Sequence, residues 1–317
     1  DVSKGGAAYS ALVTDQNWRF AQFNTFVIAV QINTVPQKFV LGSASAFVDL
    51  GGSPPQASHI AIINRFVMLT GLLSNPNRAQ WCDLGAPESW TAGVGLADFQ
   101  DQPDGGRCFA ISGGDAYGLL FQDECIRSLT YAPGSPAVFQ FTRIATQDTL
   151  FAQYSIITAG DKTFFCSAQG FRQFSPGGGL EPIGKDKVDT TFFADVDRSN
   201  LQLMIGATDP TATRVYWAYK SLQGNAGLFD KMLCYDWNLN KWTLIPMSGQ
   251  YLAYLAKPGL TLGQLEAIAP GALTVTGAAD NGLGAIRLTL NAISNAYFQI
   301  AGQNFIVVQG VVGTTEA

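Results

Sequence analysis

Histidine is nearly absent from this sequence, which contains a single one, His59, in 317 residues. One histidine excludes most histidine-ligated metal sites and leaves one position for histidine-based acid–base chemistry. His59 follows Ser58 at the mouth of an apolar run. We therefore interpret it as a strand-end histidine that is bonded to a turn.

Charge is scarce as well. Charged residues make up 14% of the chain, whereas about 25% is typical of soluble domains. With 47% hydrophobic residues, much of the surface must be covered by Ser, Thr, Asn, Gln, Gly and backbone, which favours a packed assembly over a free cytosolic enzyme. The formal net charge of -5 gives no electrostatic reason to expect tight nucleic-acid binding.

Long apolar runs are also missing. No run approaches the roughly 20 residues that a membrane-spanning helix needs, so we expect no membrane insertion. The chain starts at Asp1 and not at Met, which indicates a processed protein or numbering from within a longer one.

Cysteine occurs five times, without any C-x-x-C pair. Four of the five, Cys108, Cys125, Cys166 and Cys234, lie in or beside apolar β-rich runs, and Cys82 is the fifth. Buried free thiols are the interpretation that fits this placement, rather than disulfides or metal ligands. They indicate a reducing compartment during folding.

A repeated pattern of short β-rich runs and Gly, Asp, Asn or Ser turns extends from Asp104 to Thr191. Such runs, joined by Gly-Asp or Gln-Gly turns, are typical of antiparallel hairpins. The expected strands are Arg107–Ser112, Tyr117–Phe121, Ile126–Tyr131, Tyr154–Thr158, Thr163–Ser167 and Phe171–Phe174. A short helical turn is expected within Glu181–Ala194.

The pattern continues less regularly on both sides. Expected strands are Trp18–Phe23, Thr25–Gln31, Lys38–Leu41, Ala46–Leu50, a hairpin in His59–Gly71 broken at Asn64-Arg65, and four strands in Leu201–Tyr219 and Lys231–Met247. We interpret Gly51–Gln56 as a turn or link because it holds two prolines, and Thr91–Pro103 as a long polar connection.

The spacing amounts to one small antiparallel sheet per roughly 40 to 50 residues, the period of a propeller blade. The predicted fold is therefore all-β, a propeller of about five or six blades over residues 1–256, with a β-sandwich as the alternative. Residues 257–317 are predicted to form a small β-rich extension that continues in a longer chain or ends here. Its expected elements are a helix at Leu262–Ile268 capped by Thr261, and strands at Leu273–Thr276, Ile286–Leu290, Tyr297–Ile300 and Phe305–Val308.

Three kinds of residue cluster are candidate functional sites: an acidic group, pairs of carboxylates and glycine-rich turns. The acidic group Asp186, Asp189, Asp195 and Asp197 lacks the glycine and closing Glu of a calcium loop, so we expect a solvated polar loop. The pairs Asp123 with Glu124 and Asp98 with Asp101 are ordinary turn residues, too common to count as a glycosidase signature. Gly113-Gly114 and Gly177–Gly179 are interpreted as turn glycines with positive φ.

Tryptophan leaves two interpretations open. The indoles of Trp81, Trp90, Trp217, Trp237 and Trp242 either pack in the core and in subunit contacts, which we favour, or line a sugar-binding face. On these interpretations, the sequence indicates no catalytic, cofactor-binding or metal-binding residue, and we expect a protein that is not an enzyme.

The segment from Gly170 to Trp242 resembles virion structural proteins of tailed bacteriophages. The resemblance rests on a GF…IG…VD…F segment, then a DP…V-W-Y strand and an L-Y-D-W…K-W hairpin. The matching residues are Gly170, Phe171, Ile183, Gly184, Val188, Asp189, Phe193, Asp209, Pro210, Val215, Trp217, Tyr219, Leu233, Tyr235, Trp237, Lys241 and Trp242. The resemblance extends over about Trp18 to Met247.

This resemblance implies a propeller-like subunit of the tail or neck, similar to the nozzle or tubular proteins of short-tailed phages. Its expected partners are copies of itself in a symmetric ring, other tail or connector proteins, and double-stranded DNA that passes without sequence-specific binding. The expected location is the tail of the virion, after assembly in the cytoplasm of the bacterial host. A phage propeller that binds or cleaves host surface glycan is the alternative.

Overall fold

The computed structural model describes residues 2–5, 9–13, 16–209 and 212–252, and four short segments at 273–276, 287–290, 297–300 and 303–306. The chain divides into two compact units, Asp1–Tyr254 and Leu255–Ala317. Each unit is described by itself below.

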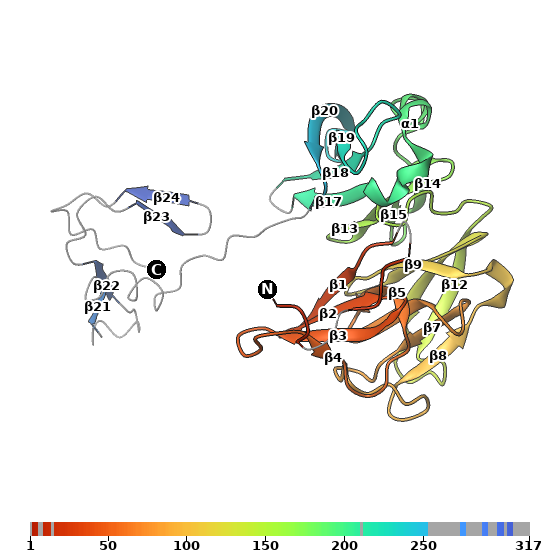
Figure 1. Cartoon of the computed structure of the whole chain (residues 1–317), viewed down its shortest axis with the longest axis vertical. Coiled ribbons are helices and arrows are strands. Elements are labelled where there is room, and N and C mark those ends of the chain that lie inside the picture. The colour runs from red at the N-terminus through yellow and green to blue at the C-terminus, as the bar shows by residue number, and fades with distance from the viewer. Residues whose placement is uncertain are drawn as a thin grey trace. The chain divides into compact units, whose positions relative to one another are not determined.

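Five four-stranded antiparallel sheets follow one another in the first unit and form a five-bladed β-propeller (Figure 1). Blade 1 consists of β1 (Arg19–Phe23), β2 (Phe26–Gln31), β3 (Thr34–Val40) and β4 (Val48–Asp49), and blade 2 of β5 (Ala57–Ile63), β6 (Phe66–Leu72), β7 (Arg78–Trp81) and β8 (Asp98–Asp101). Blade 3 consists of β9 (Cys108–Ser112), β10 (Gly118–Gln122), β11 (Cys125–Tyr131) and β12 (Phe139–Thr146). Blade 4 consists of β13 (Ile157–Ala159), β14 (Lys162–Ser167), β15 (Gly170–Ser175) and β16 (Gly179–Pro182), and blade 5 of β17 (Ile205–Asp209), β18 (Arg214–Tyr219), β19 (Phe229–Asp236) and β20 (Lys241–Gly249). The predicted propeller is confirmed, with five blades, and the sandwich alternative is wrong.

Tight turns keep each blade local in sequence. Asn24, Asn64 and Asn240 adopt positive φ at hairpin turns, a conformation that asparagine tolerates better than most residues. The predicted break at Asn64-Arg65 is one of them, and it fixes the register of β5 on β6 with Ile63 opposite Phe66. Consecutive strands therefore pair, and a blade needs no strand from elsewhere in the chain.

Four strands were not predicted: β7 and the outer strands β8, β12 and β16. Thr91–Pro103 is not simply a polar connection, because it contains β8, and no strand was expected where β12 lies. Both strands alternate between exposed and half-buried residues over most of their length. An edge strand buries little, so its sequence lacks the apolar alternation that reveals a strand.

The expectation of positive φ at the glycine-rich turns was right for Gly177 and Gly179 and wrong for Gly113, Gly114 and Gly178. Gly113 serves close packing instead, since a Cβ there would overlap the backbone of Ile62. The neighbouring Gly114 forms a parallel bridge with Ile63 of blade 2.

The first strands of the blades lie together. β1 contacts β5, β5 contacts β9, and β13 contacts β17. Each is also an edge strand of its sheet, so the innermost strands surround the propeller axis and the fourth strands lie at the rim.

Apolar cores fill four of the junctions between blades. Blades 1 and 2 share a cluster that includes Ile28 and Val67; blades 2 and 3 share one around Phe66. Blades 3 and 4 pack through Phe121 and Phe165, whose rings lie 4.9 Å apart in an edge-on arrangement. The fourth cluster joins blades 4 and 5.

The junction between blades 5 and 1 is different. Within the described residues, no corresponding apolar cluster joins these two blades. The segment before β1 is instead held by polar contacts: the backbone N of Asn17 donates to Tyr154 Oη at 2.6 Å, and its Nδ2 donates to the carbonyl of Gln202 at 3.4 Å. These hydrogen bonds join the segment before blade 1 to the turn before β13 and to Gln202 in the link that leads into blade 5.

Blade 1 is covered in part by its own N-terminal segment. Gln31 Nε2 donates to the carbonyl of Ser10, and Asn33 Nδ2 donates to that of Ala11, both at 2.9 Å. Lys4 forms an ion pair with Asp49 at 2.7 Å. Polar groups of blade 1 that no neighbouring blade contacts therefore find partners within the same region of the chain.

Short helices occupy the links between blades. A 3-10 helix, η1 (Pro103–Gly105), precedes blade 3, and α1 (Asp189–Asp195) and a second 3-10 helix, η2 (Arg198–Leu203), precede blade 5. The helical turn expected within Glu181–Ala194 is confirmed and extends one residue further. No helix among the described residues is long and apolar enough to cross a membrane.

The second unit contains two hairpins, β21 (Leu273–Thr276) with β22 (Arg287–Leu290) and β23 (Tyr297–Ile300) with β24 (Gln303–Ile306). Four strands were expected here, of which two have the predicted bounds and the last begins two residues earlier than Phe305. The helix predicted at Leu262–Ile268 with its cap Thr261 lies outside the described residues.

Candidate functional site

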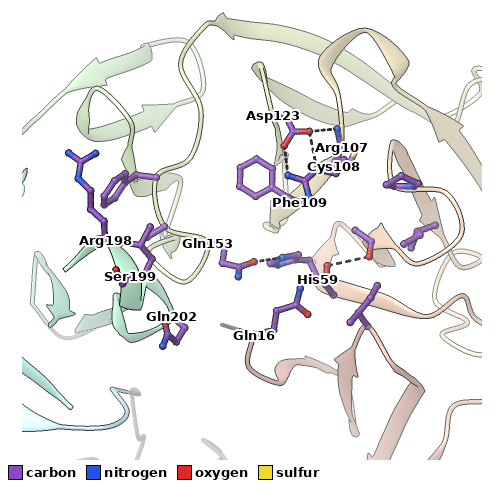
Figure 2. A pocket seen from close by; sticks show the side chains of 18 residues that line it. Gln16, His59, Arg107, Cys108, Phe109, Asp123, Gln153, Arg198, Ser199 and Gln202 are labelled. Atoms are coloured by element: carbon purple, nitrogen blue, oxygen red, sulfur yellow. Dashed lines mark hydrogen bonds and ion pairs between the residues drawn. The ribbon is translucent and has the colours of Figure 1, made fainter. Parts of the chain in front are cut away.

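A cavity of about 500 Å³ opens where the innermost strands begin (Figure 2). His59 comes from β5, Cys108 from the start of β9, and Gln153 from the turn before β13; η2 adds Arg198 and Ser199. The starts of these strands gather at one end because neighbouring inner strands run in the same direction, as the parallel bridge between β5 and the end of β9 indicates. The cavity is therefore a product of the propeller arrangement.

His59 lies deep in this cavity wall. Its side chain is 3% exposed, and its Nε2 lies 3.0 Å from Oε1 of Gln153; Figure 2 shows the two side chains facing each other. Burial, and then the charge of Arg19, hold the pKa of His59 well below its usual value, so the ring is neutral at pH 7. The expected bond to a turn is confirmed, but His59 lies within a strand and not at its end.

An ion pair occupies another wall of the cavity. Arg107 contacts Asp123 through Nε at 3.1 Å and Nη2 at 3.0 Å. Burial opposes ionisation of Asp123, but the hydrogen bonds from Arg107 outweigh it, and its pKa is lowered. A glycosidase acid needs a raised pKa, so Asp123 does not suit that role.

The other carboxylate pair is engaged as well. On the exposed strand β8, Asp101 forms a bidentate pair with Arg78, at 2.7 and 2.9 Å. The hydrogen bond from Arg78 lowers the pKa of Asp101. This edge strand lies at the rim of blade 2, away from the inner strands that line the cavity.

The acidic cluster is not simply the solvated loop that the sequence suggested. Asp195 accepts hydrogen bonds from Lys231 at 2.8 Å and from Tyr219 at 2.9 Å. Asp197 pairs with the buried ammonium of Lys220 at 2.7 Å. These carboxylates satisfy donors of blade 5 that sequence spacing could not place nearby.

Asp189, a third member, explains part of the phage-like motif. Its Oδ1 accepts a hydrogen bond from the backbone N of Phe171 at 3.1 Å. The carboxylate lies so close to Gly170 and Gly184 that a Cβ on either glycine would overlap it. Burial raises the pKa of Asp189. The fourth member, Asp186, is exposed as expected, and no group of His, Cys, Asp and Glu among the described residues is arranged to hold a metal ion.

The tryptophans pack in the core, as favoured. Trp81, Trp90 and Trp217 are buried, and Trp237 and Trp242 pack against the cluster between blades 4 and 5. Trp217 also donates from Nε1 to the carbonyl of Ser155 at 2.8 Å. A sugar-binding face built on Trp90 or Trp217 is therefore contradicted, because neither ring is accessible.

The motif residues converge on one place. Phe171, Ile183, Trp217, Leu233 and Tyr235 all belong to the apolar cluster between blades 4 and 5. The apolar residues of this motif therefore form the packing between two blades.

Sequence reasoning missed Arg19. This first residue of β1 lines two smaller cavities, of about 350 and 140 Å³. Its Cζ lies 4.0 Å from the centre of the Tyr154 ring, and its Nη2 donates to the carbonyl of Gln153. Burial lowers its pKa to about 10. Nothing in the pattern Trp-Arg-Phe distinguishes this arginine from one at a solvated strand end.

Free thiols were predicted and are found. All five cysteines are unpaired; Cys82, Cys108, Cys125 and Cys166 are buried and Cys234 is half-buried. Burial raises the pKa of Cys82 and of Cys108 to about 12, so these thiols are protonated and unreactive near neutral pH.

Comparisons with known proteins add little. No protein-family model matches the chain, and no curated protein matches it. The β-propeller domain of Cps50 (Swd1) from Myceliophteria thermophila is 9% identical over 94% of this chain and 87% of its own, with a TM-score of 0.42. BamB from Moraxella catarrhalis is 9% identical over 92% and 75%, with a TM-score of 0.42. Synechocystis apocarotenoid oxygenase is 11% identical over 95% and 74%, with a TM-score of 0.40. Likenesses this distant support no inference about function, including whether the protein is an enzyme.

Proposed function

We propose that this protein is a structural ring subunit of a bacteriophage tail, of the nozzle or tubular kind, and that its function is assembly. The proposal includes location in the virion tail and contacts with copies of itself and with other tail or connector proteins. It is supported by the resemblance over Gly170 to Trp242, whose apolar residues pack in or against one inter-blade core. A net charge of -5 favours passage of DNA through the ring without tight binding.

The observation that carries the proposal is the distribution of exposed large apolar side chains. They belong to the N-terminal segment and to blades 1, 2 and 5, and the described residues between 100 and 221 contribute none. The set is Val2, Leu12, Val13, Phe20, Val35, Leu41, Val48, Leu73, Leu84, Val94, Phe99, Leu222, Leu239, Leu244 and Tyr251. A one-sided distribution of this kind is typical of surfaces that a partner covers.

These exposed residues lie on both sides of the junction that lacks an apolar core. Val48 of β4 is 48% exposed and Leu244 of β20 is 52% exposed, and both belong to the rim strands of their blades. In a homo-oligomeric ring, two different surfaces of each subunit meet those of its neighbours. Blades 1 and 5 offer two such surfaces, so a second copy of this chain is the occupant that we propose for them.

The mass of the full chain in solution tests the proposal. We expect concentration-dependent oligomers by light scattering, and dissociation toward monomer when Val48 and Leu244 are both replaced by Asp. Thr142→Asp, on the exposed face of β12, is the matched control and should leave the oligomer intact. A chain that stays monomeric at every concentration and within virions would overturn the proposal.

Electron microscopy of particles that carry a labelled copy of the chain tests the location. The label should form a ring on the tail axis. Binding to a glycan array, or release of sugar by the purified chain, would instead support the glycan alternative, for which the buried tryptophans provide no surface.

A further inference from the structure

Hydrogen bonds join the turn before β13, residues 152–155, to four of the five blades. Two of these blades are reached through Gln153. Arg19 of β1 donates to its carbonyl, and His59 of β5 bonds to its side-chain oxygen at 3.0 Å. The 152–155 turn therefore links the inner strands of blades 1 and 2, although it belongs to neither blade.

The same turn also bonds to blades 4 and 5. Ser155 Oγ accepts from the backbone N of Cys166 in β14 at 3.1 Å, and the carbonyl of Ser155 accepts from Trp217 Nε1 in β18 at 2.8 Å. The carbonyl of Tyr154 accepts from the backbone N of Gly206 in β17 at 2.9 Å. Displacement of this turn would therefore weaken the attachment of several blades at once.

His59 is the titratable group of this arrangement. It is the chain's single histidine, and it is 3% exposed (Figure 2). Because Gln153 Oε1 is the acceptor, Nε2 carries the ring hydrogen, and the neutral ring makes this bond without burying a charge. No side chain other than histidine ordinarily changes its charge between pH 5 and 8.

The charges around His59 disfavour a second positive charge. β1, β2, β6 and β9 pack against β5, and among these strands Arg19 is the one charged side chain. The cavity wall adds the charged or titratable residues Arg107, Cys108, Asp123 and Arg198. Asp123 is the single carboxylate among the described residues of this wall, and it is already paired with Arg107. A proton on His59 would therefore add a charge near Arg19 without a carboxylate to balance it.

We propose that His59 and the 152–155 turn form an acid-sensitive latch, in which protonation of His59 releases the turn and with it the segment before blade 1. That segment is attached through Asn17, whose backbone N donates to Tyr154 Oη. In the closed state burial, and then the charge of Arg19, hold the pKa of His59 well below its usual value of 6.5. In an opened state the solvated ring regains that value, so the opened state binds more protons. The stability of the closed latch is therefore complete above pH 6.5 and falls as the pH drops below it.

Hydrogen exchange of the full chain at pH 7.0 and pH 5.5, corrected for the intrinsic exchange rates, tests the latch. We expect the protection of the Asn17 amide to fall about eightfold between these two pH values, the ratio given by an opened state with a histidine pKa of about 6.5. The Leu41 amide, which donates to the carbonyl of Thr25 within blade 1, is the internal control and should keep its protection. The ring resonances of His59 should remain those of a neutral imidazole throughout.

Two variants separate the latch from a general effect of acid. His59→Gln keeps an amide that can donate to Gln153 but takes up no proton in this range, so the protection of Asn17 should change by less than about twofold. Gln153→Glu gives the protonated ring a carboxylate partner and should also abolish the loss. If a variant fails to fold, the wild-type comparison of Asn17 with Leu41 decides. Constant protection of Asn17 in the wild-type chain, or the wild-type loss in either variant, would overturn the proposal.

Discussion

The junction between blades 4 and 5 and the junction between blades 5 and 1 are built from different chemistry. The first is a continuous apolar core in which Phe171, Trp217 and Trp242 have ring centroids 4.8 to 5.6 Å apart. At the second, no apolar cluster forms among the described residues, and Asn17 of the segment before β1 hydrogen-bonds to Tyr154 before blade 4 and to Gln202 of η2 before blade 5. The same propeller therefore has an apolar junction between blades 4 and 5, here called the packed seam, and a polar junction between blades 5 and 1, here called the polar seam.

The difference shows how a propeller can leave faces of two blades available for contact with other subunits. A blade needs apolar neighbours on both faces to be fully buried. Blades 2, 3 and 4 have them within the chain, whereas blades 1 and 5 each face a polar seam. Local opening should therefore begin there, because such openings start where few apolar contacts must be broken.

The largest expected effect is in the packed seam. Trp217→Ala should lower the free energy of unfolding by about 3 to 5 kcal/mol, because it leaves a cavity and removes a hydrogen bond. Phe20→Ala at the polar seam should change it by less than about 0.5 kcal/mol, since that ring is mostly exposed. Urea denaturation of both variants measures the contrast, and equal losses would show that the two seams are equivalent.

A smaller effect is expected at the polar seam. Tyr154→Phe removes the acceptor of the Asn17 backbone N and should cost about 1 kcal/mol of local stability. Hydrogen exchange at the Asn17 amide should accelerate while exchange in β14 is unchanged. Tyr117→Phe removes a hydroxyl that bonds to Asp161 and Thr163 and serves as control, with no change expected at Asn17.

Acid should weaken the link into blade 5. Hydrogen bonds from Lys220 first, then from Ser199 and Asn200, lower the pKa of Asp197 from 3.8 to about 2. A depressed folded-state pKa adds stability above pH 3.8 that is lost as the pH falls toward 2. Asp197→Asn should therefore flatten the stability profile over this interval, as followed by urea midpoints. Asp186→Asn, at an exposed position, should keep the wild-type slope; a wild-type slope in Asp197→Asn would contradict the assignment.

The smallest expected difference between the two seams is in the reactivity of their cysteine thiols. Cys166 lies inside the packed core, whereas Cys234 lies on the other face of blade 5, opposite Tyr216 in the sheet. A thiol-specific reagent should label Cys234 of the native protein at least about tenfold faster than Cys166, because access and thiolate fraction set the rate. Mass spectrometry of the labelled peptides measures both rates. Faster labelling of Cys166 would show that the packed seam opens first.

Local signals predicted much of the fold and little of the candidate site. Hairpins were predictable because turn residues such as Asn64 and the apolar alternation of β5 and β6 lie within a few residues of each other. Three rim strands were not predicted: β8 and β12 alternate between partly and fully exposed residues, without apolar periodicity, and β16 (Gly179–Pro182) is four residues long with no buried residue. Arg19 was not predicted as a site residue because its partners, Gln153 and Tyr154, are far away in sequence.

The sequence by itself determined the blades: each is a run of consecutive hairpins whose pairing depends on nearby turns and on alternating side chains. It also determined the buried free thiols and the scarcity of titratable chemistry. Only the tertiary structure decided which blade faces meet, since the same alternation serves a face that packs on a neighbour and a face that does not. The polar seam and the surroundings of Arg19 arise from contacts between residues more than a hundred positions apart, and no local pattern specifies such contacts.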